Sequence, residues 1–144
     1  AKDSYSAKKI LTLAFLAGAY IAFGGLLAIL VGGGVPGIGA ENPGIPKFLM
    51  GAMFPVGLMI VVMAGAELFT GNNAYFMPNV LGGKQRWTAP LRNWSLVYVG
   101  NLVGAVFVAY FLVHLTHLVH SEPWLNTVEK IAVGKTSNPV SPPF

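Results

Sequence analysis

The chain has 144 residues, of which 54% are hydrophobic and only 10% are charged. Soluble domains average about 25% charged residues, so this composition excludes a water-soluble enzyme as well as a disordered segment. The net charge of +4 comes from 9 Lys and Arg against 5 Asp and Glu, too few for a surface that binds nucleic acid. Cysteine is absent, which excludes disulfides and thiolate metal sites in this chain. The composition indicates a membrane protein.

Three charge-poor segments predict three membrane-spanning helices. Residues 10–40 and 93–119 contain no charged side chain, and residues 48–83 contain only Glu67. A helix needs about 20 apolar residues to cross the hydrocarbon of a bilayer. Spans are therefore expected near 10–31, 48–82 and 93–119. The first is too long for the roughly 7–15-residue apolar region of a signal peptide, so we interpret it as a true span.

The connecting segments differ in their content of lysine and arginine. The N-terminal tail and the 83–92 connector carry three each, whereas the connector before the second span carries one and residues 120–140 carry two. Cytoplasmic loops are enriched in these residues. We therefore expect a multi-pass protein of the cell membrane with a cytoplasmic N-terminus.

Small residues in the first and third spans predict close helix packing. Ala14, Gly18 and Ala22 recur at every fourth position, and Gly100 and Gly104 repeat this spacing in the third span. In lipid, such residues let two helix backbones approach closely.

The second span is too long and too polar at its middle to be one helix. Phe48 to Ala66 would already cross most of the hydrocarbon, and the sequence then continues Glu67-Leu-Phe-Thr-Gly-Asn-Asn73. These residue types favour turns, so we predict a break near 67–73. Irregular backbone at membrane depth is typical of binding and permeation sites, and its free N–H groups would favour an anion. The alternative, an ordinary loop after Ala66, fits poorly with the apolar stretch 74–81.

Glu67 is the only ionisable residue expected at membrane depth in this span. A fixed negative charge would repel an anion, so we interpret Glu67 as structural. Its carboxylate is expected to accept hydrogen bonds from the backbone at the break, where Gly71 and Asn72 also lie.

Two stretches resemble the signatures of the formate/nitrite transporter family: Gly65-Ala-Glu-Leu-Phe-Thr-Gly71, and Asn93-Trp94 followed by Tyr98-Val-Gly-Asn-Leu-Val-Gly104. The resemblance covers most of residues 9–110. It implies a homopentameric channel or transporter for small monovalent anions in the lipid bilayer. The implied fold is all-α, an aquaporin-like inverted-repeat helical bundle of six spans, of which this chain supplies the first three.

The resemblance also implies roles for individual residues along a transport pore. An outer constriction falls on Phe54 and Leu58, and an inner constriction falls on Leu68 and Phe69. Thr70 would line the chamber between them. From helical spacing alone, ordinary packing would be the commoner explanation of such apolar side chains.

Two lysines match positions that attract anions in the family. Lys9 would lie at the cytoplasmic mouth and Lys135 at the outer mouth, where positive potential raises the local anion concentration. The alternative for each is a solvated terminal lysine. Formate is the favoured substrate, with nitrite and hydrosulfide as further candidates, and we expect neither a cofactor, a metal nor catalysis.

The family's second broken helix and pore histidine have no counterpart in these residues. The chain is therefore expected to be the N-terminal half of one transporter domain, with the C-terminal half of the same protomer missing. His114, His117 and His120 lie near the end of the third span, roughly on one helical face.

Three alternatives to an anion channel stay open. The histidines could ligate haem or a metal ion in the membrane subunit of a redox enzyme. The protein could be a proton-coupled carrier, or an accessory subunit that is complete with three spans.

Overall fold

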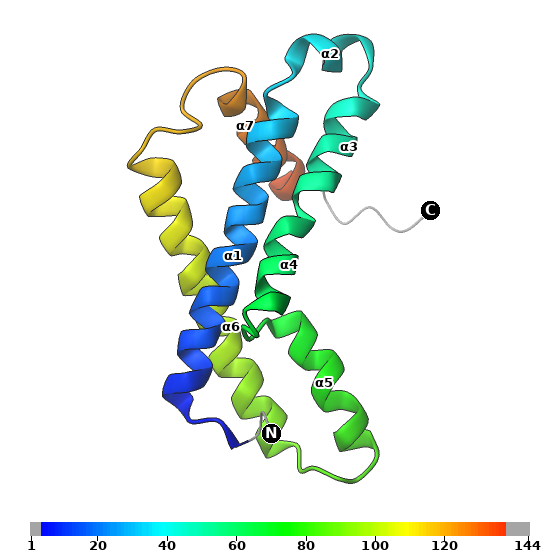
Figure 1. The fold of residues 1–144 in the computed structure, drawn as a ribbon, viewed down its shortest axis with the longest axis vertical. Helices are drawn as coiled ribbons and strands as arrows, with labels where there is room; N and C mark the ends of the chain where they lie inside the picture. The colour runs from blue at the N-terminus through cyan, green and yellow to red at the C-terminus, as the bar shows by residue number, and fades with distance from the viewer. Residues whose placement is uncertain (1–3, 138–144) are drawn as a thin grey trace.

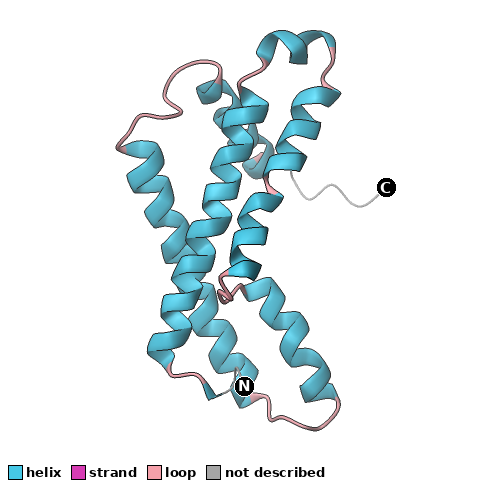
Figure 2. Ribbon diagram, in the orientation of Figure 1, coloured by secondary structure: helices cyan, strands magenta, loops and turns pink. Residues whose placement is uncertain are grey.

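The computed structural model describes residues 4–137, and all regular structure in that part of the chain is helical (Figures 1 and 2). Three segments of it are long and apolar enough to cross a membrane, namely Ala7–Gly33, Gly44–Met63 and Thr88–His114. The predicted all-α class with three spans is confirmed for these residues. In chain order the helices are α1 (Ala7–Gly33), α2 (Pro36–Glu41), α3 (Gly44–Met53), α4 (Pro55–Met63), α5 (Phe69–Leu81), α6 (Thr88–Val108), the π-helix η2 (Ala109–His114) and α7 (Trp124–Thr136).

Helix α1 is the central element, because α6 packs along one side of it and α3 and α4 pack along another (Figure 1). A Cβ atom at Gly18 would overlap the backbone carbonyl of Asn101, and one at Gly104 would overlap the carbonyl of Phe15. Gly100 approaches the side chain of Ala14 in the same crossing. The predicted small-residue packing between the first and third spans is therefore confirmed at Ala14, Gly18, Gly100 and Gly104.

The second span is interrupted twice. Pro55 begins α4 directly after α3, because proline has no N–H group to continue the hydrogen bonds of the preceding helix. The second interruption is larger: α4 ends at Met63, Gly65 has a φ of 61°, and residues 66–68 run without helical structure to α5. Helix α5 then continues toward the end of the molecule where α1 begins (Figure 1).

This non-helical segment lies earlier than the predicted 67–73. Residues from Phe69 onward form α5, whose first hydrogen bond runs from the N–H of Asn72 to the carbonyl of Leu68 at 2.9 Å. Asparagine disfavours helices when its side chain competes for backbone partners. The Asn72 carboxamide instead binds Glu67 and Asn93, so it does not compete.

The other span ends also differ from the prediction. Helix α1 begins before residue 10, because the Ser6 hydroxyl accepts a hydrogen bond from the Lys9 N–H at 3.3 Å and caps its first turn. The third span reaches only His114 rather than residue 119, since turns follow η2 and His117 has a φ of 55°. Helix α7 was not predicted; the Trp124 indole fixes it to α1 by donating to the Leu30 carbonyl at 3.0 Å.

We expect Gly18→Ala to lower the free energy of unfolding by about 1–3 kcal/mol, because the added methyl group must displace the α6 backbone. Gly25→Ala is the matched control on α1, since a Cβ atom there meets nothing within 4 Å. Unfolding of both variants in detergent, followed by circular dichroism, measures the difference. Equal midpoints for the two variants would contradict this account of the helix crossing.

Candidate functional site

The backbone of the interruption is held by helices on both sides of it. The Glu67 N–H donates to the Leu13 carbonyl of α1 at 3.2 Å. From α6, the Asn101 carboxamide donates to the Glu67 carbonyl at 3.0 Å and accepts from the Phe69 N–H at 3.0 Å. The same carboxamide nitrogen donates to the Ala14 carbonyl at 2.8 Å. Polar backbone groups that no helix satisfies therefore find partners at membrane depth.

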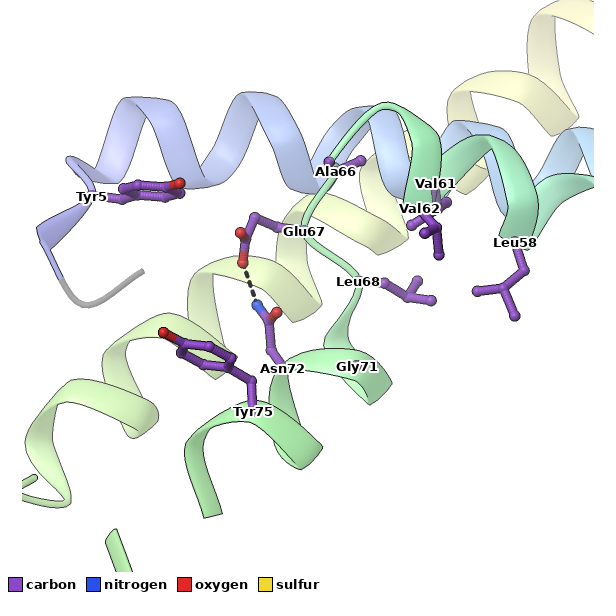
Figure 3. Close-up of a pocket in the computed structure, with 11 residues that line it drawn as sticks. Tyr5, Leu58, Val61, Val62, Ala66, Glu67, Leu68, Gly71, Asn72 and Tyr75 are labelled. Carbon is purple, nitrogen blue, oxygen red and sulfur yellow. Dashed lines mark hydrogen bonds between the residues drawn. The ribbon is translucent and has the colours of Figure 1, made fainter. Parts of the chain in front are cut away.

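A buried polar cluster lies directly beside this segment. Glu67, Asn72 and Asn93 are only 1%, 1% and 2% exposed. The Asn72 carboxamide nitrogen donates to Glu67 Oε2 at 2.5 Å and to Asn93 Oδ1 at 2.8 Å (Figure 3 shows the first of these bonds). Hydrogen bonding of this kind is what makes a buried carboxylate tolerable.

We expected the Glu67 carboxylate to accept hydrogen bonds from the backbone at the break. The structure shows that it accepts from the side chain of Asn72, and that Asn101 binds the backbone N–H of Phe69. Glu67 thus joins the interruption to α5 through a side chain.

A pocket of about 480 Å³ opens beside the interruption. Figure 3 shows Leu58 and Leu68 at one end of it and the rings of Tyr5 and Tyr75 at the other. It is bounded by α4, the interruption, α5 and the N-terminal segment, and its lining residues are Tyr5, Leu58, Val61, Val62, Gly65, Ala66, Glu67, Leu68, Gly71, Asn72 and Tyr75.

The predicted pore residues are divided between different surfaces. Leu58 and Leu68 line this pocket, whereas Phe54, Phe69 and Thr70 are not among its lining residues. Phe54 and Thr70 are exposed. The Phe69 ring turns toward α6, where it packs edge-to-face on Tyr98 with ring centroids 5.7 Å apart. Neighbouring residues point to different sides here because Leu68 is extended and Phe69 begins a helix.

Phe69 and Leu68 also border a second hollow, of about 290 Å³, on the other side of the interruption. Asn101 and Tyr98 of α6 line it together with Gly18 of α1. Leu68 is therefore the predicted constriction residue that faces both spaces.

The two predicted anion-attracting lysines are exposed and far apart on the fold. The Lys9 ammonium lies 3.7 Å from the ring centroid of Tyr5, which lines the 480 Å³ pocket. Arg92 Nη1 lies 3.5 Å from the Tyr5 carbonyl, so two cations flank this residue. Lys135 lies in the last turn of α7, a helix that packs on the opposite end of α1. A cation there is also favoured by the helix dipole.

The three histidines do not share a helical face. His114 ends η2, whereas His117 and His120 lie in the following turns, with their Nδ1 atoms 2.6 Å apart. Within residues 4–137, no group of three or more His, Asp or Glu side chains is placed to hold a metal ion. The His120 ring centroid lies 5.8 Å from that of His114 and 4.6 Å from that of His117, so the three rings are neighbours in the turns after the third span rather than on one helical face.

For two residues of the site, Asn93 and Asn101, we predicted no role from the sequence. Both lie in stretches that resemble the family signatures, and both are amides inside a segment with no charged residue. A polar side chain in such a segment needs a hydrogen-bond partner, and this need was the signal in the sequence that could have indicated a role for them. The partners lie more than twenty residues away along the chain, so spacing could not identify them.

Comparison with known proteins gives one consistent family. A model of the formate/nitrite transporter family matches residues 1–144. A probable formate transporter of Methanothermobacter thermautotrophicus is 50% identical over 85% of this chain and 44% of its own length. A formate channel of Bacillus thuringiensis is 42% identical over 93% of this chain and 50% of its own length.

The chain thus spans about half the length of these curated relatives. A formate channel of Haemophilus influenzae is 41% identical over a shorter stretch, covering 46% of this chain and 23% of its own length. The relatives are named as transporters and channels rather than enzymes, and none of these names favours a redox subunit. The chain belongs to the formate/nitrite transporter family.

Proposed function

We propose that the protein conducts small monovalent anions across the cell membrane, with formate as the first candidate and nitrite and hydrosulfide as further ones. The observation that carries this proposal is the interrupted second span beside a pocket at membrane depth. Membership of the formate/nitrite transporter family supports it, as do relatives that are named formate transporter and formate channel.

The start of α5 supplies groups that an anion can bind. The first N–H groups of a helix have no partner within that helix and carry a partial positive charge. Asn101 occupies the N–H of Phe69, so the next donors in the chain are those of Thr70 and Gly71. Gly71 lines the pocket and has no side chain to cover its backbone. The Thr70 hydroxyl is a further donor in the proposed chamber.

In the proposed path, positive charges attract the anion to the two mouths, and apolar constrictions lie between them. Lys9 and Lys135 raise the anion concentration at the two ends. The anion then loses water between Phe54 and Leu58 on one side and between Leu68 and Phe69 on the other, as in other hydrophobic constrictions. The position of Lys9 beside Tyr5, a pocket residue, supports its part in this path.

The negative charge of Glu67 must be kept from opposing anion entry. Asn72 directs one donor toward the carboxylate, and the side chain is 1% exposed. Glu67 therefore acts in the proposal as a structural residue of the interruption. A proton for transient neutralisation of the anion would come from outside residues 4–137.

Three spans need further helices to enclose a path, and the curated relatives are about twice as long as this chain. We therefore include in the proposal a C-terminal half of the same protomer. That half is related to this one as an aquaporin-like inverted repeat, and the protomers form a homopentamer. The distribution of lysine and arginine supports a cytoplasmic N-terminus.

The proposal predicts a change of selectivity from one substitution and a loss of formate flux from another, both measured in liposomes with the protein expressed from its complete reading frame. Leu58→Ala widens an apolar constriction, so it should raise the flux of larger monocarboxylates relative to formate. Thr70→Ala removes a hydrogen bond to an anion and should lower formate flux by about tenfold. Met63→Ala is the control on α4, since Met63 is 87% exposed and is not a pocket-lining residue. If both substitutions leave rate and selectivity unchanged, the proposed path is wrong.

Lys9→Gln is expected to lower formate flux roughly two- to threefold at low salt, because it removes a positive charge near one mouth. The effect should disappear near 1 M salt, where the Debye length is about 3 Å. Lys84→Gln is the control, since it removes an exposed charge from the connector between α5 and α6. A loss of flux that is independent of salt would contradict an electrostatic role.

A further inference from the structure

The Asn101 carboxamide binds the interruption as a neighbouring strand would. It donates to the carbonyl of Glu67 and accepts from the N–H of Phe69, the two groups that flank Leu68. A single residue of an adjacent parallel strand makes this pair of bonds in a β-sheet. Leu68 has the matching extended conformation, with φ −99° and ψ 131°.

Only an asparagine-like group at this distance can make all of these contacts. The carboxamide uses both donors, to Glu67 and to Ala14, and its oxygen accepts from Phe69. Aspartate lacks the donors, and leucine lacks every polar group. The approach is possible because Gly18 leaves room on α1 for the backbone of Asn101.

These hydrogen bonds affect the position of the Leu68 side chain. Leu68 borders the pocket of about 480 Å³ on one side and the hollow of about 290 Å³ on the other. The Leu68 carbonyl begins α5 by accepting from the Asn72 N–H, and the bonds from Asn101 to the residues on both sides of Leu68 fix the direction in which its side chain points.

We propose that Asn101 is a positioning residue that sets the size selectivity of the inner constriction by holding Leu68 extended. This inference rests on the proposed anion path and adds the residue that determines its width. Asn101 itself contacts three backbone groups and acts on the permeating anion only through Leu68.

The test measures the ratio of lactate flux to formate flux in liposomes that contain the protein from its complete reading frame. Asn101→Ala should raise this ratio by about tenfold, the discrimination that one methylene group confers in an apolar site. A substitution that only impairs folding leaves fewer folded molecules and lowers the lactate and formate fluxes equally, so it does not change their ratio. Ser95→Ala is the control, since it removes a hydroxyl of α6 that bonds only within the helix, to the Leu91 carbonyl.

A double-mutant cycle with Leu68→Ala tests whether Asn101 changes the flux ratio through Leu68. If Asn101 acts through Leu68, each single variant raises the ratio and the double variant resembles Leu68→Ala alone. Additive effects would overturn the proposal. Asn101→Gln keeps the carboxamide at a different reach and should give a ratio between those of the parent and Asn101→Ala.

Each remaining outcome also decides the question. A parent protein that passes no anion contradicts the proposed function. A parent that conducts formate, with an unchanged ratio in both Asn101 variants, contradicts this inference alone. If both Asn101 variants fail to assemble while Ser95→Ala assembles, Asn101 is a folding residue and the proposal is overturned.

Discussion

The structure depends on satisfying the backbone polar groups of residues 66–69 where lipid offers no hydrogen-bond partner. The Asn101 carboxamide binds two of these groups, the Glu67 carbonyl and the Phe69 N–H, and the Leu13 carbonyl accepts from the Glu67 N–H. Asn101 reaches the segment only because α1 and α6 cross at small residues, Gly18 and Gly104 among them. The interrupted span therefore depends on the close packing of α1 and α6. A substitution that separates these helices should also disturb the hydrogen bonds of residues 66–69.

The buried cluster of Glu67, Asn72 and Asn93 adds a second connection across the same region. It joins the interruption to α5 and α5 to α6, so the first turn of α5 is held at a fixed place relative to the pocket. A cluster of this kind stabilises only while its members keep their partners. The hydrogen bond from Asn72 and the burial of Glu67 explain how a carboxylate can lie beside the pocket of a protein that we propose conducts anions.

Charge distribution was sufficient to predict the three spans, because lipid strongly excludes charged side chains. The length of the second span and its turn-forming residues predicted that it is interrupted. Turn-forming propensity placed the interruption too late, since Gly71 and Asn72 belong to α5. The different directions of Leu68 and Phe69 depend on the extended backbone conformation at Leu68, which propensity does not encode. The role of Asn101 depends on contacts with distant residues and needed the structure.

Reactivity of introduced cysteines tests most directly the claim that an anion path runs beside the interruption, because residues 1–144 contain no cysteine of their own. Cysteine is placed at Leu58, at Gly71 and, as a control, at Val103 on an exposed apolar face of α6. A small water-soluble thiol reagent should modify the cysteines at 58 and 71, formate should protect both, and the one at 103 should stay unmodified. Absence of modification at 58 and 71, or modification that formate does not slow, would contradict the account.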